Sequence, residues 1–328
     1  MNTAAKLSAY GAALALLVAG SWATGSAVGP LTTVAASGEH GGMSGAASPG
    51  PGPVENGDAG HGDAHSGTVV EADQPGGLAS SRGGYTLTPN DPTLTPATTE
   101  TFSFTITEDD GAPVTAFDIE HDKRMHLIVV RRDTTGFQHV HPEMAPDGTW
   151  SVPLTVDTAG SYRAFADFTP TGGAATTLGV DLAAAGAYEP VTHLPSRTAQ
   201  VDGYTVELTG DLVAGQASPV TLAVSRDGVP VTDLQPYLAA YGHLVALRDG
   251  DLAYLHVHPE GSPSDGVTAA GPQIAFVAEV PSAGGYRLFL DFQHDGVVRT
   301  AEFTVPTGPA STSPGSMSTA PAHDADGH

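Results

Sequence analysis

An internal repeat constrains the fold of this chain more than any other feature of its sequence. The run DGAPVT at 110–115 recurs as DGVPVT at 227–232, and AGSYRAFADF at 159–168 recurs as AGGYRLFLDF at 283–292. Each copy spans roughly 105 residues, which is within the usual size of a domain. The chain is therefore predicted to be a tandem duplication, and we expect the two copies to be domains of one fold.

Each copy has the pattern of an all-β domain. Short runs rich in Val, Thr, Phe and Tyr, such as 100–107 and 286–292, alternate with Gly, Pro and Asp turns. We expect two tandem antiparallel β-sandwiches, immunoglobulin-like or cupredoxin-like, at 83–190 and 196–306. The run at 157–162 resembles the tyrosine corner of immunoglobulin-like domains.

The first 27 residues have the layout of a secretory signal. Lys6 precedes an apolar stretch at 7–20, and small residues offer cleavage after Ala23 or Ala27. If the signal is not cleaved, residues 7–20 become an anchor. Either way we expect a secreted or cell-envelope protein outside the cytoplasm.

Two segments lack the apolar residues that a packed core requires. Residues 28–82 and 307–328 consist largely of Gly, Ala, Ser, Pro and Asp, so burial cannot offset the loss of chain entropy. Both are predicted to be disordered. They carry scattered His and Met side chains, which either bind metal loosely or are incidental.

Charge and cysteine content exclude several functions. The chain has 12 Lys+Arg against 36 Asp+Glu, a formal net charge of −24, so nucleic acid is a poor partner. It has no Cys, which excludes disulfides, thiolate zinc sites, iron–sulfur clusters and blue-copper centres. Any metal site must therefore use imidazole, carboxylate or thioether ligands.

Repeated histidines predict such a metal site in each copy. An Asp-Gly turn at 249–250 would place His243 opposite His256, with His258 on the same face of the hairpin. The first copy keeps the same spacing in His126, His139 and His141. Asp167 and Asp291, on the strand that follows, are candidate fourth ligands or acceptors that fix an imidazole tautomer. The predicted metal residues are His126, His139, His141, Asp167, His243, His256, His258 and Asp291.

The neighbours of these histidines refine the prediction. The same face carries apolar residues, so the histidines lie where an apolar face ends; these residues are Ile128, Val130, Phe137, Val245, Leu247, Leu252 and Tyr254. His121 occurs only in the first copy and could add an imidazole, whereas Met125 should point away from the site. Glu143 and Glu260 are expected at the rim. Imidazole and carboxylate ligands suit Cu(II) or Zn(II).

The runs MHLIVV at 125–130 and FQHVHPE at 137–143, echoed at 242–247 and 254–260, resemble a family of exported bacterial proteins. These are described as heavy-metal-associated or hypothetical proteins with tandem cupredoxin-like or immunoglobulin-like domains. The resemblance covers 84–305 and implies metal handling outside the cytoplasm.

The main functional hypothesis is sequestration or delivery of copper or zinc, with the metal ion and another exported metal-handling protein as partners. The alternative is a non-catalytic cell-surface interaction module whose histidines and aspartates form a structural cluster with Arg163 or Arg287. We do not expect an enzyme, because the sequence lacks the usual nucleophile, phosphate-loop, dinucleotide and zincin motifs. A three-histidine site with an open position and hydrolytic or oxidative activity is the enzymatic alternative.

Overall fold

The computed structural model describes residues 74–255 and 257–308. Both repeats lie in one compact unit, Thr68–His328. The predicted signal, most of the predicted linker, the tail from 309 and His256 lie outside the described residues. Within the described ranges, no helix is long and apolar enough to cross a membrane.

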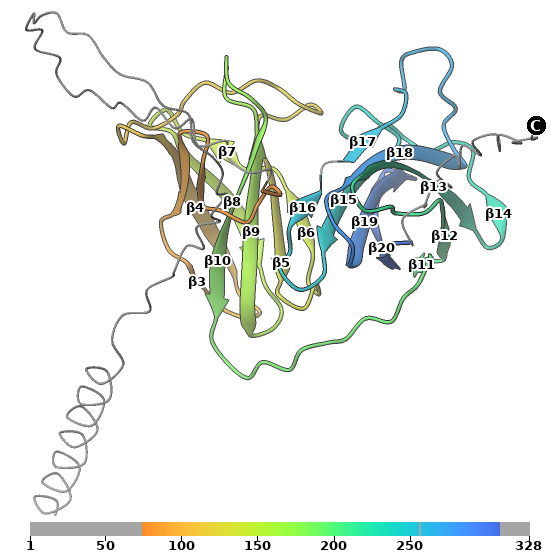
Figure 1. Ribbon diagram of the computed structural model, residues 1–328, viewed down its shortest axis with the longest axis horizontal. Helices are drawn as coiled ribbons and strands as arrows, with labels where there is room; N and C mark the ends of the chain where they lie inside the picture. Colours follow the sequence, from red (N-terminus) through yellow and green to blue (C-terminus); the bar gives the residue numbers. More distant parts are fainter. Residues whose placement is uncertain (1–73, 256, 309–328) are drawn as a thin grey trace, which may run out of the picture. The chain divides into compact units, whose positions relative to one another are not determined.

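The first repeat is a sandwich of two sheets, with strand orders β1-β2-β4-β8-β7 and β3-β10-β9-β5-β6. Figure 1 labels most of these strands. Their bounds are β1 Ser81–Arg82, β2 Tyr85–Pro89, β3 Thr93–Leu94, β4 Thr99–Glu108, β5 His126–Arg131, β6 Gln138–Val140, β7 Glu143–Met144, β8 Thr149–Thr155, β9 Gly160–Phe168 and β10 Thr176–Ala184.

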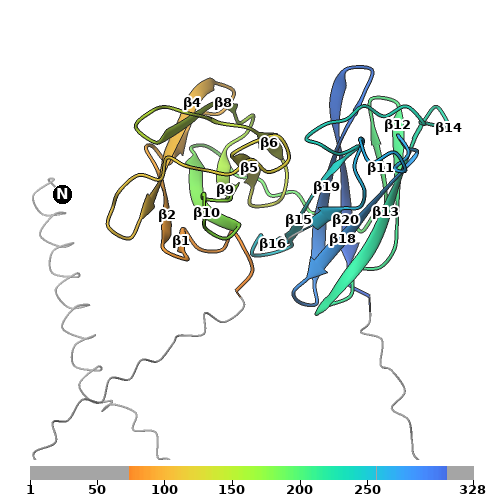
Figure 2. The same cartoon turned by 90° about the horizontal axis from the view of Figure 1, so that it is seen from above.

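The second repeat has the same plan, with orders β11-β12-β13-β18-β17 and β16-β15-β19-β20, and with β14 paired to β13. Figure 2 shows β12, β13 and β18 with β19 and β20. The bounds are β11 Thr198–Val201, β12 Tyr204–Thr209, β13 Gln216–Arg226, β14 Val229–Pro230, β15 His243–Arg248, β16 Tyr254–Leu255, β17 Val257–Pro259, β18 Gln273–Val280, β19 Gly285–His294 and β20 Val297–Pro306.

The prediction of tandem antiparallel β-sandwiches is confirmed, and the topology is that of the immunoglobulin-like fold. In each repeat, one sheet corresponds to the A-B-E-D sheet of that fold and the other to its G-F-C sheet. Both tyrosine corners are present. The hydroxyl of Tyr162 donates to the carbonyl of Thr158 at 2.7 Å, and that of Tyr286 to the carbonyl of Ser282 at 2.8 Å.

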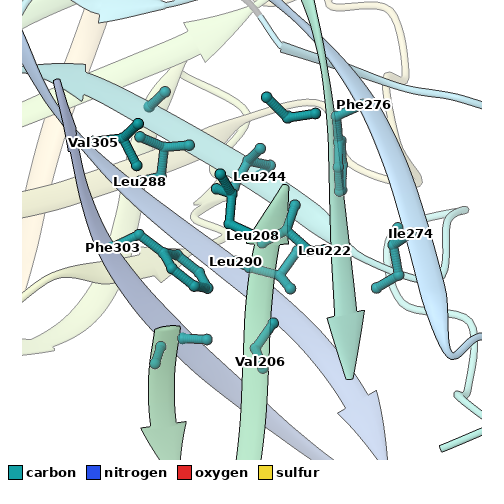
Figure 3. Close-up of a cluster of buried hydrophobic side chains, with 14 of the residues drawn as sticks. Val206, Leu208, Leu222, Leu244, Ile274, Phe276, Leu288, Leu290, Phe303 and Val305 are labelled. Atoms are coloured by element: carbon teal, nitrogen blue, oxygen red, sulfur yellow. The ribbon is translucent and has the colours of Figure 1, made fainter. Parts of the chain in front are cut away.

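Alternating apolar residues of the facing sheets fill the core of each sandwich. In the first repeat Trp150, Phe104 and Tyr162 are among the largest fully buried side chains. In the second, Phe276 from β18 and Phe303 from β20 lie among Leu and Val side chains of the neighbouring strands, as Figure 3 shows. The burial of one face of each strand follows from its period of two.

A third apolar cluster joins the two repeats. It contains buried side chains of both: Ile128, Val130, Phe165, Val245, Leu247, Leu252, Tyr254 and Phe289. Phe137 of the first repeat stacks on Phe289 of the second, with ring centroids 4.0 Å apart and planes 4° apart. The apolar face recognised in the sequence is therefore the surface on which the repeats pack together.

The predicted start of the first domain at 83 is wrong. Residues 74–82 are part of the fold, with β1 at Ser81–Arg82 and a bridge between Gly76 and Tyr254. The cause is the buried guanidinium of Arg163, which needs acceptors and donates to the carbonyl oxygens of Gly77 and Leu78. Composition alone gave no signal for this contact.

Removing the aromatic ring at the centre of the junction should destabilise the protein. We expect Phe289→Ala to lower the free energy of unfolding by about 3–5 kcal/mol, because a fully buried ring is lost. Urea unfolding measures the change. The control Val297→Ala, at a side chain 47% exposed, should change it by less than about 0.5 kcal/mol. Equal effects of the two substitutions would show that this face is not buried.

Candidate metal centre

His126 opens the buried strand β5 and is 4% exposed. Its Nε2 lies 3.0 Å from the carbonyl oxygen of Glu120. Glu120 belongs to a tight turn in which Glu120 and Lys123 exchange backbone hydrogen bonds, and the two central residues, His121 and Asp122, have φ of 48° and 64°. A carbonyl only accepts, so Nε2 of His126 carries the proton and its Nδ1 is left with a lone pair.

His139 faces that lone pair. It lies on β6 opposite Ile128, and its Nε2 is 3.0 Å from Nδ1 of His126. Its other nitrogen, Nδ1, is 2.8 Å from a carboxylate oxygen of Asp291, which comes from the second repeat. Both side chains are almost fully buried, 2% and 4% exposed. Asp291 also accepts from the hydroxyl of Thr300 at 2.6 Å, so its carboxylate is fixed in place.

When both rings are neutral, neither of the two facing nitrogens, Nδ1 of His126 and Nε2 of His139, carries a proton. The Glu120 carbonyl and the Asp291 carboxylate each require an N–H, which uses the single proton of each neutral imidazole. Nδ1 of His126 and Nε2 of His139 then point two lone pairs at each other. A third proton between these nitrogens, or a metal cation bound by both, would remove the repulsion. Backbone carbonyls and carboxylates are the usual acceptors behind metal-bound histidines.

His141 completes a group of three. Ligand atoms of His126, His139 and His141 all lie within 4.8 Å of one another. The ring centroid of His141 is 5.0 Å from that of His126 and 4.8 Å from that of His139. Its Nε2 is buried and has no hydrogen-bond partner among the described residues.

His243 of the second repeat lies against this group. Its ring stacks on that of His126 at 5.4 Å between centroids and 4° between planes, and it is 4.9 Å from the ring of His139. Its Nδ1 is buried without a hydrogen-bond partner in the described part of the chain. His121 is next to it, with ring centroids 5.3 Å apart.

Burial keeps several of these rings neutral. Desolvation lowers the pKa of His126 to about 4, although the hydrogen bond to Glu120 opposes it, and lowers that of His141 to about 3. Desolvation also holds the pKa of His243 well below its usual range, and neighbouring histidines add to the effect. At pH 7 the three rings therefore offer lone pairs rather than positive charge.

A cavity of about 200 Å³ gives access to one side of the cluster. Four histidines line it: His121, His126, His243 and His258. The remaining lining residues include Lys123, Arg124, Asp167 and Tyr254. The cavity therefore reaches His126 of the triad and His243.

The structure does not describe the two predicted triads equally. His243, predicted in the second triad, packs on His126 of the first. His258 is exposed on β17 and pairs with Val277 of the opposite sheet. His256 lies outside the described residues.

The two aspartates have different partners. Asp291 accepts from Nδ1 of His139 in the other repeat, which is the predicted role of an acceptor that fixes an imidazole tautomer. Asp167 accepts from the hydroxyl of Thr177 at 2.8 Å and also bonds the side chain of Tyr254. Met125 is buried in the core of its sandwich, as predicted, and both Glu143 and Glu260 are exposed.

The two arginines of the structural alternative are engaged elsewhere. Arg163 binds the segment before β1 and Asp181, whereas Arg287 donates to the hydroxyl of Thr134 at 3.0 Å and pairs with Glu302. Neither hydrogen bond reaches a histidine of the cluster. If the histidines form a purely structural cluster, their hydrogen-bond acceptors are therefore Glu120 and Asp291 and not an arginine's partners.

The predicted hairpin register is wrong by two residues. β15 pairs with β16 through Ala246–Leu255 and Leu247–Tyr254, so the connection is a four-residue loop instead of the expected two-residue turn. Asp251 stabilises the wider loop by pairing with Arg248 and accepting from the backbone N–H of Ala253. A shift of two keeps the same side chains on the same face. In the first repeat Ile128 pairs with His139 and Leu127 with Val140, so His126, His139 and His141 share a face as predicted.

Comparison with known families places both sandwiches in one of them. The family described as Domain of unknown function (DUF8832) matches residues 79–186 and 199–308, more than half of the chain. The chain belongs to this family. The two matched ranges coincide with the two repeats.

Comparison with curated proteins finds no match. Among solved structures, the chain is similar to the Escherichia coli adhesin FdeC, with 13% identity, 69% of this chain and 65% of that chain covered, and a TM-score of 0.22. It is similar to invasin, a bacterial integrin-binding protein, with 15% identity, coverage of 68% and 39%, and a TM-score of 0.20. Domains 4 and 5 of the S-layer protein SbsC give 11% identity, coverage of 70% and 98%, and a TM-score of 0.19.

The chain spans less than two thirds of the length of the first of these structures, and 15% of a Salmonella alpha-2-macroglobulin. Similarity at these TM-scores carries no argument about function, so the site geometry has to supply it.

The free energy of unfolding of the chelator-treated protein should decrease as the pH falls below about 6.5, the usual pKa of histidine. The folded pKa values of His126 and His141 are below the usual 6.5, so the unfolded state binds more protons from about pH 6.5 downward. Stability is complete above that pH and decreases by at most about 1.4 kcal/mol per pH unit for each ring, less where water reaches it. Urea midpoints at about pH 7 and pH 5.5 measure the slope.

His126→Phe/His141→Phe should flatten this slope, and His193→Ala, a change outside the cluster, should leave it as it is. A wild-type midpoint that stays constant over this interval would contradict the assignment of buried neutral rings.

Proposed function

We propose that the protein binds one divalent transition-metal ion, Cu(II) or Zn(II), through His126, His139 and His141, and that it sequesters or delivers this ion outside the cytoplasm. One observation carries the proposal: two nitrogens with free lone pairs, Nδ1 of His126 and Nε2 of His139, lie 3.0 Å apart. Their outer nitrogens are already bound to acceptors.

The distance between these nitrogens suits two ligands of one ion. Nitrogens bonded at about 2.0–2.1 Å with an angle of 90–109° between the bonds are about 2.8–3.4 Å apart. The observed 3.0 Å lies in this range. A proton shared between the rings is the competing occupant: burial of His126 opposes its positive charge, whereas the carboxylate of Asp291 beside His139 favours it.

The ligand set selects the class of metal. Neutral imidazoles suit Cu(II), Zn(II) and Ni(II), whereas Ca(II) and Mg(II) prefer oxygen ligands. Without cysteine the chain cannot build a thiolate site, and copper binds more tightly than zinc to an equal set of nitrogens. The net charge of −24 increases the local concentration of cations.

The proposed role is binding without catalysis. The signal-like residues 1–27 support export, and a cell-envelope or secreted location is part of this proposal. The cavity beside His126 and His243 supports exchange of the ion with solvent or with another exported metal-handling protein. Such exchange fits storage or transfer of the ion.

A specific observation also favours a second candidate, a cell-surface interaction module. The bond between His139 and Asp291, together with the apolar junction, connects the repeats without any metal. The cluster would then be structural, with a proton between His126 and His139.

Substitution of the triad separates the two candidates. We expect the purified protein to bind one equivalent of Cu(II) or Zn(II) in isothermal titration, and His126→Ala/His141→Ala to weaken binding at least about 100-fold, because two of three ligands are lost. Binding should weaken below about pH 6 as imidazoles take up protons. His193→Ala is the matched control, since Nε2 of His193 lies 3.0 Å from the backbone carbonyl oxygen of Asp133 and not in the cluster.

Equal affinity of the wild type and the double variant would refute the metal site. A variant that loses stability, while the wild type shows no change in melting temperature with metal, would establish the structural role instead.

The carboxylate behind His139 should tune the affinity. Asp291→Asn removes the negative charge that orients and polarises the ring, and we expect metal affinity to fall about 10–100-fold with the stoichiometry unchanged. The control is Asp233→Asn, which alters another aspartate–histidine pair, at His294. If both variants bind like the wild type, Asp291 has no part in the site.

A further inference from the structure

The two repeats contribute unequally to the proposed metal site, and their contributions meet at the junction. Three histidines come from β5, β6 and the segment after β6 of the first repeat. One comes from the start of β15 in the second repeat, and the acceptor for His139 comes from β19. The inference below rests on the proposed function, because it requires an ion at the triad.

We propose that His243 supplies a fourth nitrogen to the ion held by His126, His139 and His141, so that a single metal ion is bound by both repeats and fixes the junction between them.

The spacing of the four rings supports a common ligand sphere. Two imidazoles bonded to one ion at about 2.0 Å place their ring centroids about 5 Å apart. The centroid distances from His126 to His139, His141 and His243 are 5.3, 5.0 and 5.4 Å. Those from His139 to His141 and His243 are 4.8 and 4.9 Å. His243 therefore belongs to the same cluster as the triad although it is far from it in sequence.

The chemistry of His243 favours a ligand role over a packing role. A buried imidazole usually pairs both nitrogens, yet Nδ1 of His243 has no hydrogen-bond partner among the described residues. Zn(II) in a closed site takes four ligands, and three protein ligands leave one position to fill.

His243 has to turn toward the ion to bind it. The group with ligand atoms within 4.8 Å of one another consists of His126, His139 and His141, and the ring of His243 is parallel to that of His126. His243 also lines the cavity beside the cluster. The neighbouring His121 lies half-exposed on the turn that ends at Lys123, so it is the alternative fourth ligand.

Binding by both repeats has a mechanical consequence. An ion that holds β5 and β15 together adds its binding free energy to the apolar contacts of the junction, since separation of the repeats would expose the site. Metal loading should then protect the junction from local opening. The repeats would be coupled tightly with the ion and more loosely without it.

The experiment uses the full chain and the variant His243→Phe, which keeps an aromatic ring on His126 and removes both nitrogens. Cu(II)-loaded protein is examined by electron paramagnetic resonance, in which nitrogen hyperfine splitting counts the coordinated imidazoles. Hydrogen exchange of β5, β15 and β19 is followed with and without Zn(II). His121→Phe is the matched control at the neighbouring ring.

We expect four coordinated imidazoles in the wild type and in His121→Phe, and three in His243→Phe, with Zn(II) affinity lower by at least about tenfold in His243→Phe. Zn(II) should slow exchange of β5 and β15 in the wild type and not in that variant. Wild-type affinity and protection in His243→Phe would overturn this inference and leave the triad site standing. If the wild type itself binds no metal, the proposed function fails as well.

Discussion

Two imidazole nitrogens that face each other at 3.0 Å inside a protein need something between them. The carbonyl of Glu120 fixes the proton of His126 on one outer nitrogen, and the carboxylate of Asp291 does the same for His139. The inner nitrogens are consequently unprotonated whenever both rings are neutral. Burial of His126 disfavours a third proton, and we propose that a divalent cation of the imidazole-binding class is bound by both nitrogens instead. The remaining features of the site follow from this constraint.

The junction between the repeats positions these groups. Its apolar cluster includes Ile128 and Val130 of β5 and Val245 and Leu247 of β15. On both strands the histidine comes first and the apolar residues follow on the same face, so packing these faces together brings His126 and His243 into a stack. Asp291 reaches His139 for the same reason, because β19 lies beside β15. Duplication of one domain thus produced a composite site in which each copy contributes different groups.

Much of the fold could be predicted from the sequence, because it depends on local pattern: strand periodicity, turn residues and the tyrosine corner at Tyr162 and Tyr286. The first triad could also be predicted, since residues two apart on a strand share a face. The position of His243 against the first repeat could not be predicted, because it depends on how the apolar faces of the two repeats pack together. The loop around Asp251 was misjudged since a side-chain pair with Arg248 outweighed the Asp-Gly turn preference. His121 occurs in only one repeat and was predicted as an additional imidazole, and its ring does lie beside that of His243.

The protonation of the facing rings tests the account most directly. Nitrogen-15 NMR of the histidine rings at pH 7 distinguishes N–H from bare nitrogen and imidazole from imidazolium. We predict that His126 carries its proton on Nε2 and His139 on Nδ1, that both inner nitrogens are bare in chelator, and that the same two resonances shift on addition of one equivalent of Zn(II). A charged imidazolium with a proton shared between the two rings, unchanged by Zn(II), would contradict the metal site and establish a structural histidine cluster.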